Sequence, residues 1–308
     1  MPGITGILNF GINFLSLVFY HAGCKRVDFP GNFAPTSLVL RNSGRDLVEH
    51  STLFRDELCQ ALVSDLQFDQ QAYRPCIVYI NGAYWGIHNI REKQNEDYLA
   101  SHHGVDPDRV DILELYHGSP PPIVVEGESR HYDALIAYLE DHSMSEPEHY
   151  EYVKTQMYMD HFISYIAAEI YLGNVDWLGN NVKFWRSQTP DGRWRWMLFD
   201  IDWGLGRARG GVEHNTLAMA TDPSGPGRYP AWTTFLIRRL FASEDFVRDF
   251  ANRSADLMNS IFLPERVDST LQVLKATIEP EVDRHFARWG GDRENWERNL
   301  SAQSEYVR

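Results

Sequence analysis

Two acidic segments on either side of an expected β-hairpin constrain this chain more than any other feature. GNVDWLGNNVKFWR spans residues 173–186, and FDIDWGLG follows at residues 199–206. The sequence around both segments is rich in apolar residues, so we expect them against a core. Three carboxylates and two amides placed together are costly to bury unless a positive charge joins them. The two segments therefore predict a site for a divalent cation.

One expected helix and two expected strands surround the two acidic segments and determine how the segments are arranged. Apolar residues at helical spacing in residues 153–172 predict an almost fully buried helix that ends at Gly173. Residues 182–186 and 193–202 then predict two strands joined by the turn SQTPDG. Side chains alternate along a strand, so Asp200 and Asp202 are expected on one face of the second strand.

This order of elements is typical of protein-kinase-like phosphotransferases. Their catalytic loop carries an Asp beside the acceptor hydroxyl, with a metal-binding Asn five residues later, and an Asp before an aromatic residue and Gly holds the metal. Asp176 and Asn181 have this spacing, and Asp202-Trp203-Gly204 fits the second motif. Mg²⁺ prefers hard oxygen ligands, which these side chains supply. The pattern therefore favours phosphoryl transfer, which depends on positioning and charge neutralisation.

The first half of the chain predicts a mixture of strands and helices. Residues 36–42 predict a buried strand, and residues 51–66 predict a helix with a Ser/Thr cap. Two β-rich runs flank Asn81-Gly82, which is a strong hairpin signal, and a helix should end at Gly104.

The second half predicts mainly helices. Residues 105–150 are acidic and irregular apart from a short helix, and the chain from residue 232 is helical. The fold class is therefore α+β. We expect one domain with a mixed N-terminal lobe at residues 1–140 and a mainly helical catalytic lobe at residues 141–308.

Charge and composition exclude several classes of function. With 29 basic and 43 acidic residues the net charge is −14, which opposes binding to nucleic acid or to an anionic membrane. A nucleotide held through a metal is compatible with this charge. The apolar start of the chain has no basic leader region and no cleavage site, so it predicts strands rather than a signal peptide or a membrane span.

Several separated motifs together resemble the CotH family of atypical kinases, named for a bacterial spore-coat protein. They are NGAYWGIHNIREKQNEDYL, LGNVDWLGNNVKFWR and WRWMLFDIDWGLG, with LVLRNSGRD and FRDELCQAL before them and FLPERVDSTLQVLKATIEPEVDRHFARW near the end. The resemblance covers residues 35–305. It implies a divergent two-lobed protein-kinase-like fold, ATP with Mg²⁺ or Mn²⁺, and phosphorylation of Ser/Thr in an acceptor protein. It also suggests a spore-coat or extracytoplasmic location, and we expect a monomer.

The resemblance assigns roles to residues of the two acidic segments. Asp176 corresponds to the catalytic-loop Asp, and Asn181 to a metal ligand. Asp202 corresponds to the main metal-binding Asp, with Asp200 as a second candidate. Asn180 is the alternative to Asn181.

The N-terminal lobe departs from the family pattern. Kinases use a Lys that contacts the α- and β-phosphates and pairs with a helix Glu. The chain has five Lys, and the segment FGINFLSLVFYHAG, where the resemblance places a Lys-bearing strand, contains none of them. Lys25 and Arg41 are the nearby substitutes for nucleotide binding, and Glu57 is the candidate helix Glu. From this departure we expect either a fragment without its first strands or a divergent enzyme.

Two other functions stay open on the sequence. A kinase-like domain without its Lys is also compatible with a noncatalytic binding, surface or coat module. Residues 200–202 match the D-x-D of nucleotide-sugar glycosyltransferases, which require an alternating β/α run that the sequence does not show. The Gly-rich segment 204–229 is either an acceptor-facing loop, like an activation segment, or a plain loop.

Overall fold

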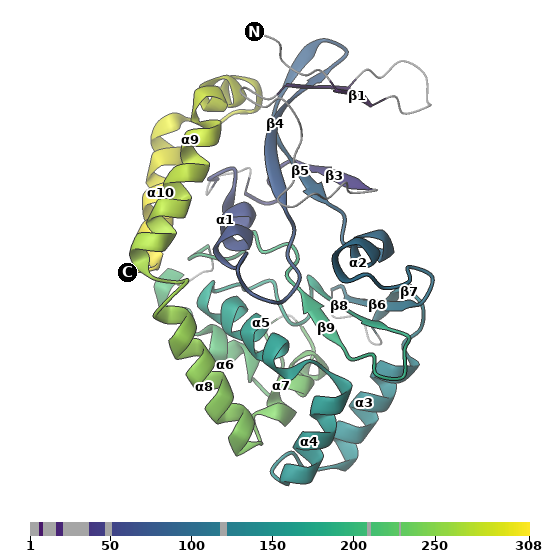
Figure 1. Cartoon of the computed structure of the whole chain (residues 1–308). Coiled ribbons are helices and arrows are strands. Elements are labelled where there is room, and N and C mark those ends of the chain that lie inside the picture. Colours follow the sequence, from purple (N-terminus) through teal and green to yellow (C-terminus); the bar gives the residue numbers. More distant parts are fainter. Residues whose placement is uncertain are drawn as a thin grey trace.

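A computed structural model describes residues 6–8, 17–20, 37–46, 51–117, 122–207, 211–227 and 229–308. The predicted nucleotide-binding residue Lys25 lies outside these ranges. Within them the chain combines helices with two antiparallel sheets, which confirms the α+β class. In Figure 1 the first sheet stands at the top, and most of the helices that follow the second sheet gather at the bottom.

The first sheet, sheet A, has the strand order β1-β2-β4-β5-β3 within the described residues. Its strands are β1 (Gly6–Leu8), β2 (Leu17–Tyr20), β3 (Leu38–Arg41), β4 (Tyr73–Ile80) and β5 (Ala83–Glu92). The predicted hairpin is confirmed: β4 and β5 are joined at Asn81 and Gly82, whose φ values are 51° and 79°. The prediction that β3 is buried is wrong, because within the described residues β3 is an edge strand paired with β5 alone, and its residues 38–40 are exposed.

Two helices accompany sheet A. Helix α2 (Glu96–His103) is capped by Asn95 and ends at Gly104 in the left-handed conformation, as predicted. Helix α1 (Arg55–Leu62) begins at Phe54 without a side-chain cap, so the predicted Ser/Thr cap is wrong. Asp46 serves instead, because its carboxylate accepts hydrogen bonds from the backbone N–H groups of Thr52 and Arg55, at 3.0 and 3.2 Å.

The second sheet, sheet B, has the strand order β7-β6-β8-β9. Strands β6 (Val110–Leu115) and β7 (Ile123–Glu126) lie in the region predicted to be irregular, so that prediction is wrong. Strand β6 pairs with β8 (Val182–Ser187), which pairs with β9 (Arg195–Met197). Sheet B therefore contains strands from both sides of the predicted lobe boundary at residue 140, and that boundary stays a prediction.

Strand β9 is shorter than predicted. It ends at Met197, so Asp200 and Asp202 lie in the loop after it and not on the strand. Asp200 has a φ of 51°, which is incompatible with an extended strand. The side chains of Asp200 and Asp202 nevertheless both contact Arg41. The conformation of the loop, and not alternation along a strand, brings them together.

Helices make up most of the chain that surrounds and follows sheet B. They are α3 (Arg130–Asp141), α4 (Pro147–Gln156), α5 (Met159–Tyr171), α6 (Thr216–Ala220), α7 (Phe235–Leu240), α8 (Glu244–Met258), α9 (Pro264–Trp289) and α10 (Arg293–Tyr306), with short 3₁₀ turns at Gly211–Glu213 and Ala231–Thr234. The single helix predicted over residues 153–172 is two helices. The chain is extended at Met157 and Tyr158, where it forms a bridge to Trp194.

Helices α9 and α10 run side by side along one edge of the molecule, next to sheet A and α1 (Figure 1). His285 Nδ1 of α9 accepts a hydrogen bond from the Ile87 N–H of β5 at 3.0 Å, and Trp289 Nε1 donates to the Trp85 carbonyl at 2.6 Å. Helix α9, near the end of the chain, therefore packs against sheet A and supports it. Among the helices of the described residues, none has the length and apolar character required to cross a bilayer.

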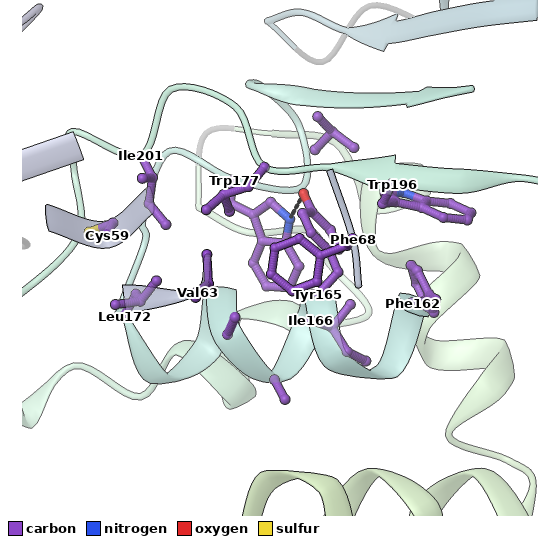
Figure 2. Close-up of a cluster of buried hydrophobic side chains, with 14 of the residues drawn as sticks. Cys59, Val63, Phe68, Phe162, Tyr165, Ile166, Leu172, Trp177, Trp196 and Ile201 are labelled. Carbon is purple, nitrogen blue, oxygen red and sulfur yellow. Dashed lines mark hydrogen bonds between the residues drawn. The ribbon is translucent and has the colours of Figure 1, made fainter. Parts of the chain in front are cut away.

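Helix α5 lies at the centre of the core and anchors both acidic segments (Figure 2). Trp177, next to Asp176, is buried and its Nε1 donates to Tyr165 Oη of α5 at 3.0 Å. Ile201, between Asp200 and Asp202, is also fully buried in this cluster. Each acidic loop is therefore held by an apolar residue, while its carboxylates lie at the border of the core.

Candidate active site

Asp176 lies in a loop whose side chains converge on its carboxylate. Oδ2 accepts hydrogen bonds from Asn180 Nδ2 at 3.0 Å and Asn181 Nδ2 at 3.3 Å, and Oδ1 accepts one from Tyr229 Oη at 2.5 Å. The Asp176 N–H donates to Asn174 Oδ1 at 3.0 Å. The predicted catalytic residue is thus fixed in position from both its backbone and its side chain.

Asp200 and Asp202 converge on the guanidinium of Arg41, at the end of β3. Arg41 Nη2 contacts Asp200 and lies 3.0 Å from Asp202 Oδ2. Asp202 Oδ2 also accepts the Arg45 N–H at 2.7 Å. Burial, followed by the nearby charge of Asp200, raises the pKa of Asp202 to about 7, and burial raises the pKa of Asp200 as well. Two carboxylates therefore share one guanidinium, and burial and their mutual repulsion favour the neutral form of Asp202 in this arrangement.

Asn181 joins the two acidic loops. Its Nδ2 donates to Asp176 and also to the Asp200 carbonyl at 3.1 Å. The structure therefore brings Asp176, Asn181 and the Asp200–Asp202 segment into one network. The φ values of Leu178, Asn181 and Asp200 are 71°, 55° and 51°, a region that non-glycine residues rarely adopt. Such strained residues tend to gather at functional sites.

Glu57 is placed away from the acidic loops and pairs with an arginine that the sequence left without a role. It is fully buried on α1, where it contacts Arg91 Nη2 of β5 and accepts from Asn89 Nδ2 at 2.6 Å. Burial raises the pKa of Glu57 even though Arg91 opposes the change. Glu57 therefore pairs with a cation from sheet A, but this cation is Arg91 and not a Lys.

Asp56 connects this buried pair to the acidic loops. Its Oδ2 lies 2.6 Å from Arg91 Nη1 and 3.0 Å from Arg41 Nη1. Burial alone would raise the pKa of Asp56, but Arg91 and Arg41 outweigh it and the net direction is downward. A chain of alternating charges therefore runs from Glu57 through Arg91, Asp56 and Arg41 to Asp202.

The turn after β3 closes over Asp202. Gly44 has a φ of 59°, and a Cβ at this position would overlap the Asp202 carboxylate and Arg41. Only glycine therefore allows the backbone to come this close. On the other side, Arg55 Nη1 donates to the carbonyls of Gly204 and Leu205 at 3.0 and 2.9 Å, which ties α1 to the loop that follows Asp202. Sequence reasoning missed these contacts because the partners lie about 150 residues apart.

Glu169 of α5 supports the loop that carries Asp176. Its Oε2 accepts from Asn174 Nδ2 at 2.9 Å, and Asn174 in turn accepts the Asp176 N–H. The side chain is fully buried. Burial, opposed by hydrogen bonds from Asn174 and Tyr165, raises the pKa of Glu169 to about 8. Glu169 is therefore protonated at neutral pH in the folded protein.

This shift predicts a pH-dependent stability that Glu169→Gln removes. The unfolded chain releases the Glu169 proton near pH 4.5, whereas the folded protein keeps it until about pH 8. Between these values the group lowers the free energy of unfolding by about 1.4 kcal/mol per pH unit as the pH rises. Between pH 5 and pH 8 the free energy of unfolding, measured by urea denaturation, should therefore fall less steeply for Glu169→Gln than for wild type. Glu148→Gln, at an exposed position of α4, is the control, and equal slopes for Glu169→Gln and wild type would contradict the shift.

The residues present fit a divalent cation in their chemistry. Oxygen donors from Asp200, Asp202 and Asn181 are the ligands that Mg²⁺ or Mn²⁺ takes. The carboxylate pair already gathers around a cation, Arg41. The predicted set is two carboxylates and the amide of Asn181, and across the described ranges no cluster of three or more His, Cys, Asp or Glu side chains is able to hold a metal.

A comparison with protein families decides the classification. The family described as CotH kinase protein matches residues 16–308, nearly the whole chain. The chain belongs to the CotH kinase family. The resemblance found in the sequence is thereby confirmed, and membership of the CotH family supports a kinase-related function with a protein substrate. A search of curated proteins found no match.

Proposed function

We propose that the chain transfers the γ-phosphate of ATP to a Ser or Thr hydroxyl of an acceptor protein in a metal-dependent reaction. The observation that carries this proposal is the network formed by Asp176, Asn181 and the Asp200–Asp202 loop in a member of the CotH kinase family. Their order and spacing match the catalytic loop and metal-binding segment of kinases.

Each residue of the network has a role in the proposed reaction. Asp176 orients the acceptor hydroxyl and takes its proton, and Asn180 and Asn174 hold Asp176 in place. Asp202, with Asp200 and Asn181, would hold Mg²⁺ or Mn²⁺. When bound, the metal neutralises charge on the transferring phosphate.

Arg41 is the proposed substitute for the missing Lys. It lies beside the carboxylates that would hold the metal, and a guanidinium suits phosphate oxygens, so Arg41 would contact the phosphates of a bound nucleotide. Glu57 acts indirectly, through Arg91 and Asp56. Lys25 stays a second candidate for nucleotide binding.

The remaining features of the proposal come from the family resemblance and the sequence. They are a two-lobed kinase-like architecture with a junction near residue 140, a Ser/Thr-bearing protein acceptor, a monomeric state, and a spore-coat or extracytoplasmic location. Neither a nucleic acid nor a membrane is expected as a partner, because the net charge is −14.

A noncatalytic binding module is the second candidate. The observation that favours it is the contact of Arg41 with Asp200 and Asp202, because a guanidinium balances part of the charge that a metal would otherwise balance. The glycosyltransferase alternative loses support from the fold. Both described sheets are antiparallel, whereas that alternative requires alternating strands and helices with parallel strands.

Thermal shift measurements test the proposal. Mg²⁺ or Mn²⁺ with ATP should raise the melting temperature of wild type, because a ligand that binds only the folded state stabilises it. Asp202→Asn should melt at or above wild type without metal, since it removes one of two crowded charges, and it should lose the nucleotide-dependent shift. Asp141→Asn, at an exposed position of α3, should keep the full shift.

Two results would count against the proposal. A wild-type-sized shift in Asp202→Asn would remove Asp202 from the metal ligands. A wild-type shift with Mn²⁺ and a UDP-sugar, but none with ATP, would favour the glycosyltransferase alternative.

A further inference from the structure

Tyr229 brings a hydroxyl group onto the proposed catalytic residue. Its Oη donates to Asp176 Oδ1 at 2.5 Å. Tyr229 lies at the end of the Gly-rich segment 204–229, 53 residues after Asp176 in the sequence. Its side chain is 5% exposed and Asp176 is 9% exposed, so the carboxylate that should receive an acceptor hydroxyl is covered.

The phenol ring also covers the backbone of the catalytic loop. A Cβ added at Gly179 would overlap the Tyr229 ring, so the ring lies directly on the loop between Asp176 and Asn180. The segment that carries Tyr229 is shaped by turns. The Tyr229 N–H donates to the Pro226 carbonyl at 3.3 Å, and Gly225 and Gly227 have φ values of 99° and 63°.

We propose that Tyr229 occupies the position of the acceptor hydroxyl, so an acceptor protein has to displace it before transfer. This inference rests on the proposed function. In that reaction Asp176 receives a hydrogen bond from the acceptor hydroxyl, and in this structure it receives one of the same kind from Tyr229. Only molecules in which Tyr229 is displaced are able to bind the acceptor. The apparent affinity for the acceptor is therefore the intrinsic affinity multiplied by the fraction of molecules in that form.

A positioning role for Tyr229 makes the opposite prediction. If the hydroxyl mainly holds Asp176 in its reactive orientation, removing it lowers turnover. If the hydroxyl competes with the acceptor, removing it strengthens acceptor binding and leaves ATP binding unchanged. Asp176 retains hydrogen bonds from Asn180 and Asn181 in both cases, so its orientation does not depend on Tyr229 alone.

The test compares wild type, Tyr229→Phe and Tyr306→Phe in phosphate transfer from labelled ATP to dephosphorylated casein. The first variant keeps the ring and removes only the hydroxyl. Tyr306 is the matched control, because its Oη donates to the Tyr171 carbonyl at 3.2 Å and its ring packs against Gly206. We expect Tyr229→Phe to lower the KM for casein by about threefold or more with an unchanged KM for ATP. Tyr306→Phe should match wild type.

The outcomes separate this inference from the proposed function. If wild type transfers phosphate and Tyr229→Phe has an equal or higher KM for casein, or a lower kcat at unchanged KM, Tyr229 is not a competitor and the proposed function stands. The inference also fails if Tyr306→Phe shows the same gain. If neither wild type nor Tyr229→Phe transfers phosphate, the proposed function and the inference fall together.

Discussion

Replacing Asp176 by Ala is expected to lower phosphate transfer by about 10²-fold or more, the usual scale for a positioned base. ATP affinity should change only a few-fold, because Asp176 acts on the acceptor hydroxyl. Asp202→Ala should damage both transfer and ATP affinity, because Asp202 would hold the metal that neutralises the charge of the phosphates. Labelled-phosphate transfer to a Ser-rich acceptor and ATP binding, measured in parallel, give the two quantities.

The comparison of the two variants is more informative than either alone. Both side chains are buried, so melting temperatures have to show first that each variant is folded. Asp141→Ala, at an exposed position, serves as the control for losing a carboxylate. Full transfer by Asp176→Ala would overturn its catalytic assignment even if the family fold is right. Absence of both ATP binding and transfer in wild type would favour the noncatalytic module.

Replacing Arg91 by Met is expected to destabilise the fold by about 3–5 kcal/mol, the usual cost of removing one partner from a buried ion pair. Arg91 is 1% exposed and contacts both Asp56 and Glu57. Methionine fills much of the space but leaves two buried carboxylates without their main counterion. The free energy of unfolding from urea denaturation measures the loss.

A second variant separates lost charge from lost packing. In the double variant Arg91→Met with Glu57→Gln, one of the two carboxylates becomes neutral, while Asp56 keeps its contact with Arg41. We expect this variant to recover part of the stability that Arg91→Met loses. If the double variant is less stable than Arg91→Met alone, the loss comes from packing and not from uncompensated charge.

The candidate site was predictable where its signals are local. Asp176 and Asn181 lie five residues apart in one loop, and Asp202 precedes an aromatic residue and Gly, so spacing alone indicates their chemistry. Arg91, Asp56 and Tyr229 lack such a signal. Arg91 lies 35 residues from Asp56 and 34 residues from Glu57 in the sequence, and Tyr229 lies 53 residues from Asp176. Only tertiary folding brings these partners together.

The fold, like the candidate site, was predictable where its signals lie within a few neighbouring residues. The Asn81-Gly82 hairpin and the end of α2 at Gly104 follow from turn and cap chemistry in a few residues. Strand β6 was missed because all but one of its residues are buried, so the alternation typical of a half-exposed strand is absent. The cap of α1 was misassigned because Asp46 lies well before the helix.

The contact of Arg41 with Asp200 and Asp202 has a consequence for how the molecule changes when ligand arrives. Under the proposed function, a divalent ion would be held by Asp200 and Asp202, so Arg41 would have to give up its contacts with them. Arg41 stands at the end of an edge strand, so the group that has to move belongs to a strand that pairs with a single neighbour within the described residues.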